Sequence, residues 1–110
     1  MITYEYIWIG GEDELRSKTR VMEAKDNLSE IPEWNYDGSS TKQAKGNDSE
    51  VIIRPVKMVK DPFRGKDHRL VLCDTYKPDG TPLPNNHRVK AKEIFDKYPD
   101  AKPWFGLEQE

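Results

Sequence analysis

The sequence has little cysteine and histidine, and no long hydrophobic run. Its single cysteine, Cys73, cannot form an internal disulfide. With only two distant histidines, His68 and His87, it also lacks the ligand spacing of a structural zinc site. The longest apolar runs, such as residues 7–9 and 70–73, fall far short of the roughly 20 residues that a membrane-spanning helix needs. No signal-peptide segment follows the first methionine, so we expect a soluble, cytoplasmic chain with no membrane partner.

The sequence also lacks an excess of either charge and the common nucleotide-binding loops. Eighteen Lys and Arg residues face 20 Asp and Glu residues among 110, for a formal net charge of -2. Balanced charge argues against a disordered tail and against a nucleic-acid partner. Neither a G-x-x-x-x-G-K-[ST] nor a G-x-G-x-x-G loop occurs. A hydrophobic share of 35% predicts a small core, with little apolar area left for a deep active-site cavity.

What the sequence does contain is alternation typical of β-strands. β-branched and aromatic residues recur at every second position in four segments. We expect strands at residues 1–9, 15–22, 51–59 and 69–76. Gly10 and the glycine after it supply the turn of an opening hairpin. Pro55 marks an edge or a bulge, because proline cannot donate to a strand ladder.

The remaining segments predict a long loop and one helix. Residues 23–50 are poor in aliphatic side chains, and loops of that length in a small domain are usually functional or disordered. Trp34 and Tyr36 interrupt this loop as exposed or anchoring aromatics. Apolar residues spaced by three and four predict a helix near residues 88–98. Residues 104–110 have the pattern of a further strand.

Two acidic motifs could carry chemistry. Glu108 and Glu110, one residue apart in a segment with strand character, would project from the same face. Carboxylate oxygens suit hard cations such as Mg²⁺ or Mn²⁺, although an E-x-E pair is more often a solvated acidic tail. Asp37 begins the run D-G-S-S-T beside two aromatics. This run is either an ordinary turn or a carboxylate and hydroxyl that bind something cationic.

One basic motif is also present. Arg16, Lys18 and Arg20 alternate along one predicted strand, so they share a face. Such a row could hold a phosphate or an acidic partner. We interpret it as a solvated strand face, because the balanced overall charge weakens a nucleic-acid role.

Read in order, four segments together resemble the eukaryotic-type (type II) glutamine synthetases nearly end to end. They are LRSKTR at residues 15–20, PEWNYDGSST at 32–41, KDPFR at 60–64 and WFGLEQE at 104–110. The resemblance implies an α+β fold. Residues 1–83 would form the family's N-terminal β-grasp domain, with a mixed, mostly antiparallel sheet. Residues 84–110 would form a linker helix and the first strand of a truncated catalytic domain, so that the chain is a fragment.

The resemblance also implies a reaction. Members of the family use ATP to phosphorylate the side-chain carboxylate of glutamate, and ammonia then attacks γ-glutamyl phosphate to give glutamine. Divalent Mg²⁺ or Mn²⁺ ions neutralise the developing phosphate charge. The implied partners are other synthetase subunits in a double-ring homo-oligomer, with active sites between subunits. This fragment alone is expected to be inactive, because the remaining metal, glutamate and ATP ligands of the family are absent from it.

Site residues carry over onto matching positions. Asp37 and Ser40 match the aspartate and second serine of the family's D-G-S-S loop, which is associated with ammonium binding and completes the site of a neighbouring subunit. Glu108 and Glu110 match the E-x-E metal motif. Glu108 and Trp104 would lie near the nucleotide. The alternative is a non-catalytic interaction module: a stand-alone β-grasp domain that docks onto full-length subunits and modulates their assembly.

Overall fold

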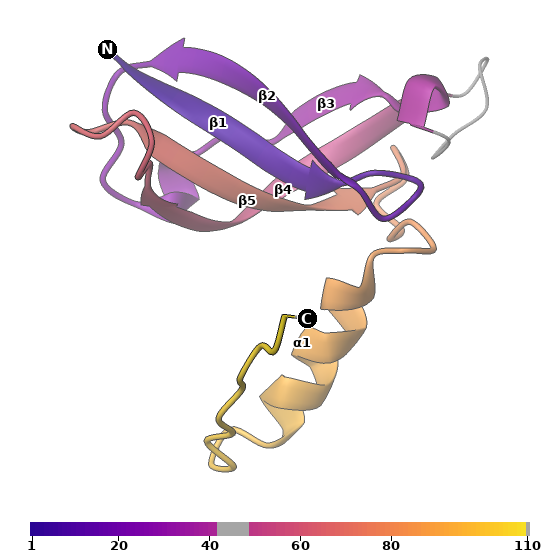
Figure 1. The fold of residues 1–110 in the computed structure, drawn as a ribbon. Helices are drawn as coiled ribbons and strands as arrows, with labels where there is room; N and C mark the ends of the chain where they lie inside the picture. Colours follow the sequence, from indigo (N-terminus) through magenta and orange to yellow (C-terminus); the bar gives the residue numbers. More distant parts are fainter. Residues whose placement is uncertain (42–48, 110) are drawn as a thin grey trace.

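The computed structural model describes residues 1–41 and 49–109, without the side chains of residues 40 and 41. Its five strands form one sheet in the order β2-β1-β5-β4-β3. The strands are β1 (Ile2–Ile9), β2 (Leu15–Met22), β3 (Trp34–Asp37), β4 (Glu50–Lys60) and β5 (Arg69–Tyr76). β1 and β5 pair in parallel, and every other neighbouring pair is antiparallel. This is the mixed α+β architecture expected from the sequence (Figure 1).

The predicted hairpin and second strand pair are confirmed. β1 and β2 pair along their whole length, from Ile2 opposite Met22 to Ile9 opposite Leu15. β4 and β5 pair with a register shift between Pro55 and Lys57. The proline therefore marks a bulge, as its missing N–H predicts.

The segment expected to be one long loop contains more structure than its composition indicates. It holds two short 3₁₀ helices, η1 (Leu28–Glu30) and η2 (Gly38–Thr41), and the edge strand β3. β3 has only four residues, and it exists because each of them faces a residue of β4, from Trp34 opposite Ile53 to Asp37 opposite Glu50. Such long-range pairing has no signature in local composition.

The core lies on one face of the sheet. Alternate residues of β1 provide its centre, since Tyr4 and Tyr6 are fully buried and Trp8 is nearly so. The other buried members are Ile31, Ile53, Val71 and Cys73. Two tyrosine hydroxyls hold the segment before β3 against this face: the Tyr4 hydroxyl accepts the backbone N–H of Lys25 at 2.7 Å, and the Tyr6 hydroxyl donates to the carbonyl of Pro32 at 2.8 Å.

The interpretation of the basic row as a solvated strand face is wrong for two of its three members. In the strand register, Lys18 lies opposite Tyr6 and Arg20 opposite Tyr4, so both side chains are on the core face. Both side chains reach the Trp34 ring: the Lys18 Nζ lies 3.7 Å and the Arg20 Cζ 4.7 Å from its centroid. Long cationic side chains can cover apolar surface in this way while their charged ends stay near water.

These contacts show that the sheet is strongly curled. β2 and β3 are its two edge strands, at opposite ends of the strand order, yet side chains of β2 touch β3. Lys18 also donates a hydrogen bond from Nζ to the backbone carbonyl of Asn35 in β3, at 2.8 Å. The curl therefore brings the two edges together across the core face.

A linker connects the sheet to helix α1 (His87–Lys97), which stands apart from the sheet (Figure 1). Leu83 is buried, the Asn85 side chain donates to the carbonyl of Gly10 at 2.8 Å, and the Asn86 side chain donates to that of Thr75 at 2.8 Å. Asn86 also caps α1, because its side chain accepts the N–H of Val89. None of the helical residues is buried.

The prediction of a strand at residues 104–110 is wrong for the part of it that the structure describes. Residues 101–109 have no helix or strand and run back beside α1 (Figure 1). There Phe105 meets Phe95 edge to face with ring centroids 5.8 Å apart. A strand needs a neighbour with which to exchange backbone hydrogen bonds, and none of the described strands lies beside this segment.

Candidate active-site loop

Asp37 is the last residue of β3, directly before the short helix η2. Aromatic contacts hold this strand in place. Tyr36 stacks on Trp8 with ring centroids 4.6 Å apart, and Trp34 meets Tyr6 edge to face with ring centroids 5.2 Å apart. The two aromatics of the loop therefore anchor β3 to the core. Directly after Asp37, the backbone N–H of Gly38 donates to the carbonyl of Ser49 at 2.6 Å.

The carboxylate of Asp37 is exposed and held in its charged form. Its Oδ1 accepts the hydroxyl of Ser39 at 2.7 Å and the backbone N–H of the same residue at 3.0 Å. The hydrogen bond from the Ser39 side chain, followed by that from its backbone, lowers the pKa of Asp37 below its ordinary value. A carboxylate of this kind is ionised at neutral pH and is a weak base. It suits electrostatic binding of a small cation better than proton removal.

The other predicted site residues lie elsewhere or outside the description. The backbone of Ser40 is in η2, but its side chain is not described. Trp104 is 98% exposed and Glu108 is also exposed, both on the segment beside α1. Figure 1 shows that segment and η2 in separate parts of the molecule. Within this chain, then, Asp37 and Glu108 are not brought together.

The donor chemistry of the E-x-E motif fits a hard divalent cation, but its set of ligands is incomplete in the described part of the chain. Glu110 lies outside the described residues. In residues 1–41 and 49–109 no group of three or more His, Cys, Asp and Glu side chains could hold a metal ion. One exposed carboxylate does not make a metal site, because Mg²⁺ takes about six ligands in near-octahedral geometry.

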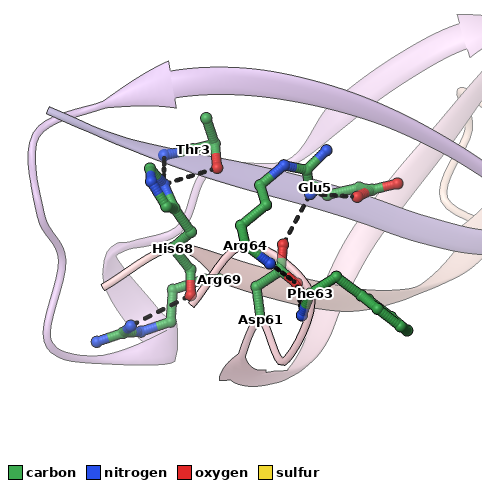
Figure 2. Close-up of polar contacts among 7 residues, drawn as sticks. All are labelled: Thr3, Glu5, Asp61, Phe63, Arg64, His68 and Arg69. Carbon is green, nitrogen blue, oxygen red and sulfur yellow. Dashed lines mark hydrogen bonds and ion pairs between the residues drawn. The ribbon is translucent and has the colours of Figure 1, made fainter. Parts of the chain in front are cut away.

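The motif KDPFR forms a structural network (Figure 2). Asp61 is 2% exposed, and its Oδ1 accepts the backbone N–H groups of Phe63 and Arg64 at 2.8 and 3.1 Å. One guanidinium nitrogen of Arg64, Nη1, donates to Asp61 Oδ2 and to Glu5 Oε1, each at 2.7 Å. An aspartate followed by proline signals such a turn, because its side chain can accept the N–H two residues later.

His68 also has a structural partner. His68 precedes β5, and its Nδ1 accepts the backbone N–H of Thr3 at 2.9 Å and lies 2.8 Å from the Thr3 hydroxyl (Figure 2). This contact joins the start of β1 to the start of β5.

Cys73 is buried in the core, and burial raises the pKa of its thiol to about 12. Such a thiol is a poor nucleophile, because the thiolate is the reactive form.

A groove of about 530 Å³ lies between the sheet and the start of α1. Its lining includes the aliphatic side chains of Ile7, Leu15 and Leu72 and the polar residues Asn85 and Arg88. Neither Asp37 nor Glu108 lines it. Over the residues that the structure describes, no helix is long and apolar enough to cross a membrane.

Comparison with known proteins gives the family. The model described as "Glutamine synthetase, beta-Grasp domain" matches residues 2–78. The chain is 56% identical over 113 residues to the chloroplastic glutamine synthetase of Brassica napus, a match covering 99% of this chain and 26% of that protein. It is 54% identical over 114 residues to the glutamine synthetase cytosolic isozyme 1-5 of Arabidopsis thaliana, covering 99% of this chain and 32% of that one.

A viral relative matches equally well. The putative glutamine synthetase of Acanthamoeba polyphaga mimivirus is 54% identical over 111 residues, covering 96% of this chain and 31% of that protein. The chain thus spans 26% to 32% of the length of these three relatives. The matched domain coincides with the five-stranded sheet and its buried aromatic core. The chain therefore belongs to the glutamine synthetase family, and its sheet is the β-grasp domain of that family.

Proposed function

We propose that this chain is the N-terminal part of an enzyme that joins ammonia to glutamate at the expense of ATP, through γ-glutamyl phosphate. The observation that carries the proposal is the match to glutamine synthetases over 99% of the chain. The geometry of the D-G-S-S loop supports it, because that loop presents an ionised carboxylate at the end of a firmly anchored strand.

In this proposal Asp37 binds ammonium at an active site completed by a neighbouring subunit. A loop that faces a partner explains how a small domain can serve catalysis when its own groove contains no site residue. The charge of Asp37 attracts ammonium and raises its local concentration beside the acyl phosphate. Ser40, one residue beyond the Ser39 that holds Asp37, is proposed to act in the same loop. The subunits would form the double ring expected for the family.

The metal belongs to the catalytic domain. We propose Glu108 and Glu110 as ligands of Mg²⁺ or Mn²⁺, with Glu108 and Trp104 near ATP, in an enzyme whose further residues complete the site. When bound, such ions would neutralise charge on the transferring phosphoryl group.

We also propose a cytoplasmic location. The relatives include both chloroplastic and cytosolic isozymes. Fractionation of cells that express the tagged protein would test this location.

Substitution of Asp37 in the full-length enzyme tests the function. Asp37→Asn keeps the shape of the loop and removes its charge, so we expect the KM for ammonium to rise at least about tenfold. Formation of the acyl phosphate from ATP and glutamate should change little.

In the same assay Glu110→Ala should raise the concentration of Mg²⁺ needed for half-maximal activity. An unchanged metal titration would contradict the assignment of Glu110.

The chain offers a matched control. Asp79 is exposed, lies in the run D-G-T, and accepts the hydroxyl and the N–H of Thr81 at 2.7 and 2.9 Å, as Asp37 does from Ser39. Its pKa is lowered for the same reason, first by the backbone and then by the side chain of Thr81. Asp79→Asn should leave the KM for ammonium unchanged. Equal effects of the two substitutions would mean that Asp37 has only a structural role.

A second candidate is the interaction module. The specific observation in its favour is the exposed apolar face of α1, where Ile94, Phe95 and Tyr98 are 48%, 50% and 65% exposed. Such a face can pack against another protein surface. Co-elution of the chain with full-length subunits would favour this candidate over the first.

A further inference from the structure

The contact between the two edge strands has a consequence for the candidate site. We propose that Lys18 is a positioning residue, which ties the edge strand β3 to β2 and so holds Asp37 in place. The inference rests on the proposed function of Asp37. It adds a residue from another strand, 19 positions earlier in the sequence, to the machinery of ammonium binding.

β3 needs such a tie because it is short and has a neighbour on one side only. Its four residues pair with β4, and no described strand exchanges backbone hydrogen bonds with its other edge. An exposed edge leaves backbone carbonyls without partners in the sheet. Lys18 supplies one: its Nζ donates to the carbonyl of Asn35 at 2.8 Å, two residues before Asp37. A hydrogen bond from a charged donor is stronger than a neutral one.

The same ammonium group also fixes the first residue of β3. It lies 3.7 Å from the centroid of the Trp34 ring, within the range of a cation–π contact. Arg20 lies over the same ring at 4.7 Å. Burial, and then the positive charge of Arg20, lower the pKa of Lys18, which agrees with a side chain packed into the seam between the strands.

The strand transmits this constraint to the loop. Trp34 and Asn35 are held by Lys18, Tyr36 is stacked on Trp8, and Asp37 follows directly. Without the tie, β3 would keep its pairing with β4, its aromatic contacts and the contact of Trp34 with Arg20, but it would lose the hydrogen bond from Lys18 to the carbonyl of Asn35. We therefore expect the loop after β3 to open more often, and not the domain to unfold.

Amide exchange on the 110-residue chain tests the tie without any assumption about activity. The reporters are the N–H of Gly38, bonded to Ser49, and that of Ser39, bonded to Asp37. In Lys18→Met, which keeps an unbranched side chain over Trp34, both should exchange roughly tenfold faster. Val71 in the core should be unaffected. If Lys18→Met does not fold, Lys18→Gln serves instead, and Lys18→Arg should restore protection.

Arg16→Met is the matched control. Arg16 lies on the same strand and face, but its guanidinium pairs with Glu14 at 3.2 Å within the hairpin. Its loss should leave the exchange of Gly38 and Ser39 unchanged. Unchanged exchange in Lys18→Met, or equal acceleration in Arg16→Met, would overturn the proposal whatever the function of Asp37.

Kinetics of the full-length enzyme complete the test. Lys18→Met should raise the KM for ammonium roughly threefold to tenfold, and should add nothing in the Asp37→Asn background, because Lys18 acts through Asp37. An effect that persists in that background would overturn the positioning role. Faster exchange with an unchanged KM in both single variants would contradict the proposed function of Asp37 and still support the tie.

Discussion

Asp61 shows how one residue stabilises a turn and makes stability depend on pH. Burial opposes its ionisation, but hydrogen bonds from the Arg64 side chain and from the N–H groups of Arg64 and Phe63 outweigh that effect and lower its pKa. The shared guanidinium likewise lowers the pKa of Glu5. Groups with a lowered pKa in the folded state stabilise it above their unfolded pKa, and this contribution disappears as the pH falls through the folded value.

Asp61→Asn should therefore lower the melting temperature at neutral pH by about 5 °C, since the ion pair with Arg64 is lost while the turn keeps its shape. The ordinary pKa of Asp61 is 3.8. As the pH falls below that value, the parent protein loses the same interaction, so the difference between the two proteins should shrink. Thermal unfolding at pH 7, 5 and 3 measures this.

Asp67, an exposed residue of the same turn region, provides the control for that measurement. Asp67→Asn should melt like the parent protein at each pH. A difference between Asp61→Asn and the parent that stays constant from pH 7 to pH 3 would show that the ionised carboxylate is not what stabilises the turn.

At the level of elements, α1 differs from the sheet in what holds it together. It has 11 residues, none buried, and a single i,i+4 ion pair between Lys92 and Asp96. A helix of this length is marginal in water without tertiary packing, and such an exposed ion pair contributes only about 0.3–0.5 kcal/mol. The Asn86 cap, the contact with Phe105 and an ion pair from Arg88 to Asp74 of β5, at 3.8 Å, are further supports.

We expect α1 to open independently of the sheet. Amides near its centre, such as that of Phe95, should exchange at least about a hundredfold faster than those of Tyr6 and Val71, which are fully buried in β1 and β5. Hydrogen exchange followed by NMR on the 110-residue chain measures the ratio. Protection of α1 equal to that of the core strands would mean that packing interactions hold the helix.

The positions of the regular elements could be read from local patterns. The predicted strands and helix lie within a residue or two of β1, β2, β4, β5 and α1. β3 could not be predicted, because its four residues become a strand only by pairing with β4, and the strand expected at residues 104–110 has no such partner. For the candidate site, the sequence motifs pointed to Asp37. They did not predict that Lys18 contacts β3, because a contact between two sheet edges depends on the curl of the sheet and not on composition.

For the whole molecule, the apolar surface of α1 and of the segment beside it bears on what the chain can do alone. Trp104 and Leu107 are almost completely exposed, and the apolar side chains of α1 are about half exposed. Surfaces of this kind are normally covered by another domain or a partner. The helix η2 and the segment at residues 101–109 lie in separate parts of the molecule (Figure 1), and the described residues contain no group of three or more His, Cys, Asp and Glu side chains that could hold a metal ion.

The isolated chain should therefore show no metal-dependent formation of glutamine or hydrolysis of ATP. A coupled assay with glutamate, ammonium, ATP and Mg²⁺ measures this, with a full-length glutamine synthetase as the positive control. Turnover by the chain would contradict the expectation.

A binding experiment tests the interaction module. Co-elution of the chain with full-length subunits at micromolar concentration would favour the interaction module, and separate elution would count against it.

The sequence alone determined the family and four of the five strands together with the helix, because alternation, turn residues and short motifs are local properties of the chain. Tertiary structure decided which elements meet. The parallel pairing of β1 with β5 joins residues more than 60 positions apart, and the curl of the sheet turns Lys18 from a solvated cation into a bridge to β3. Such contacts depend on burying a shared aromatic core, which no segment can do by itself.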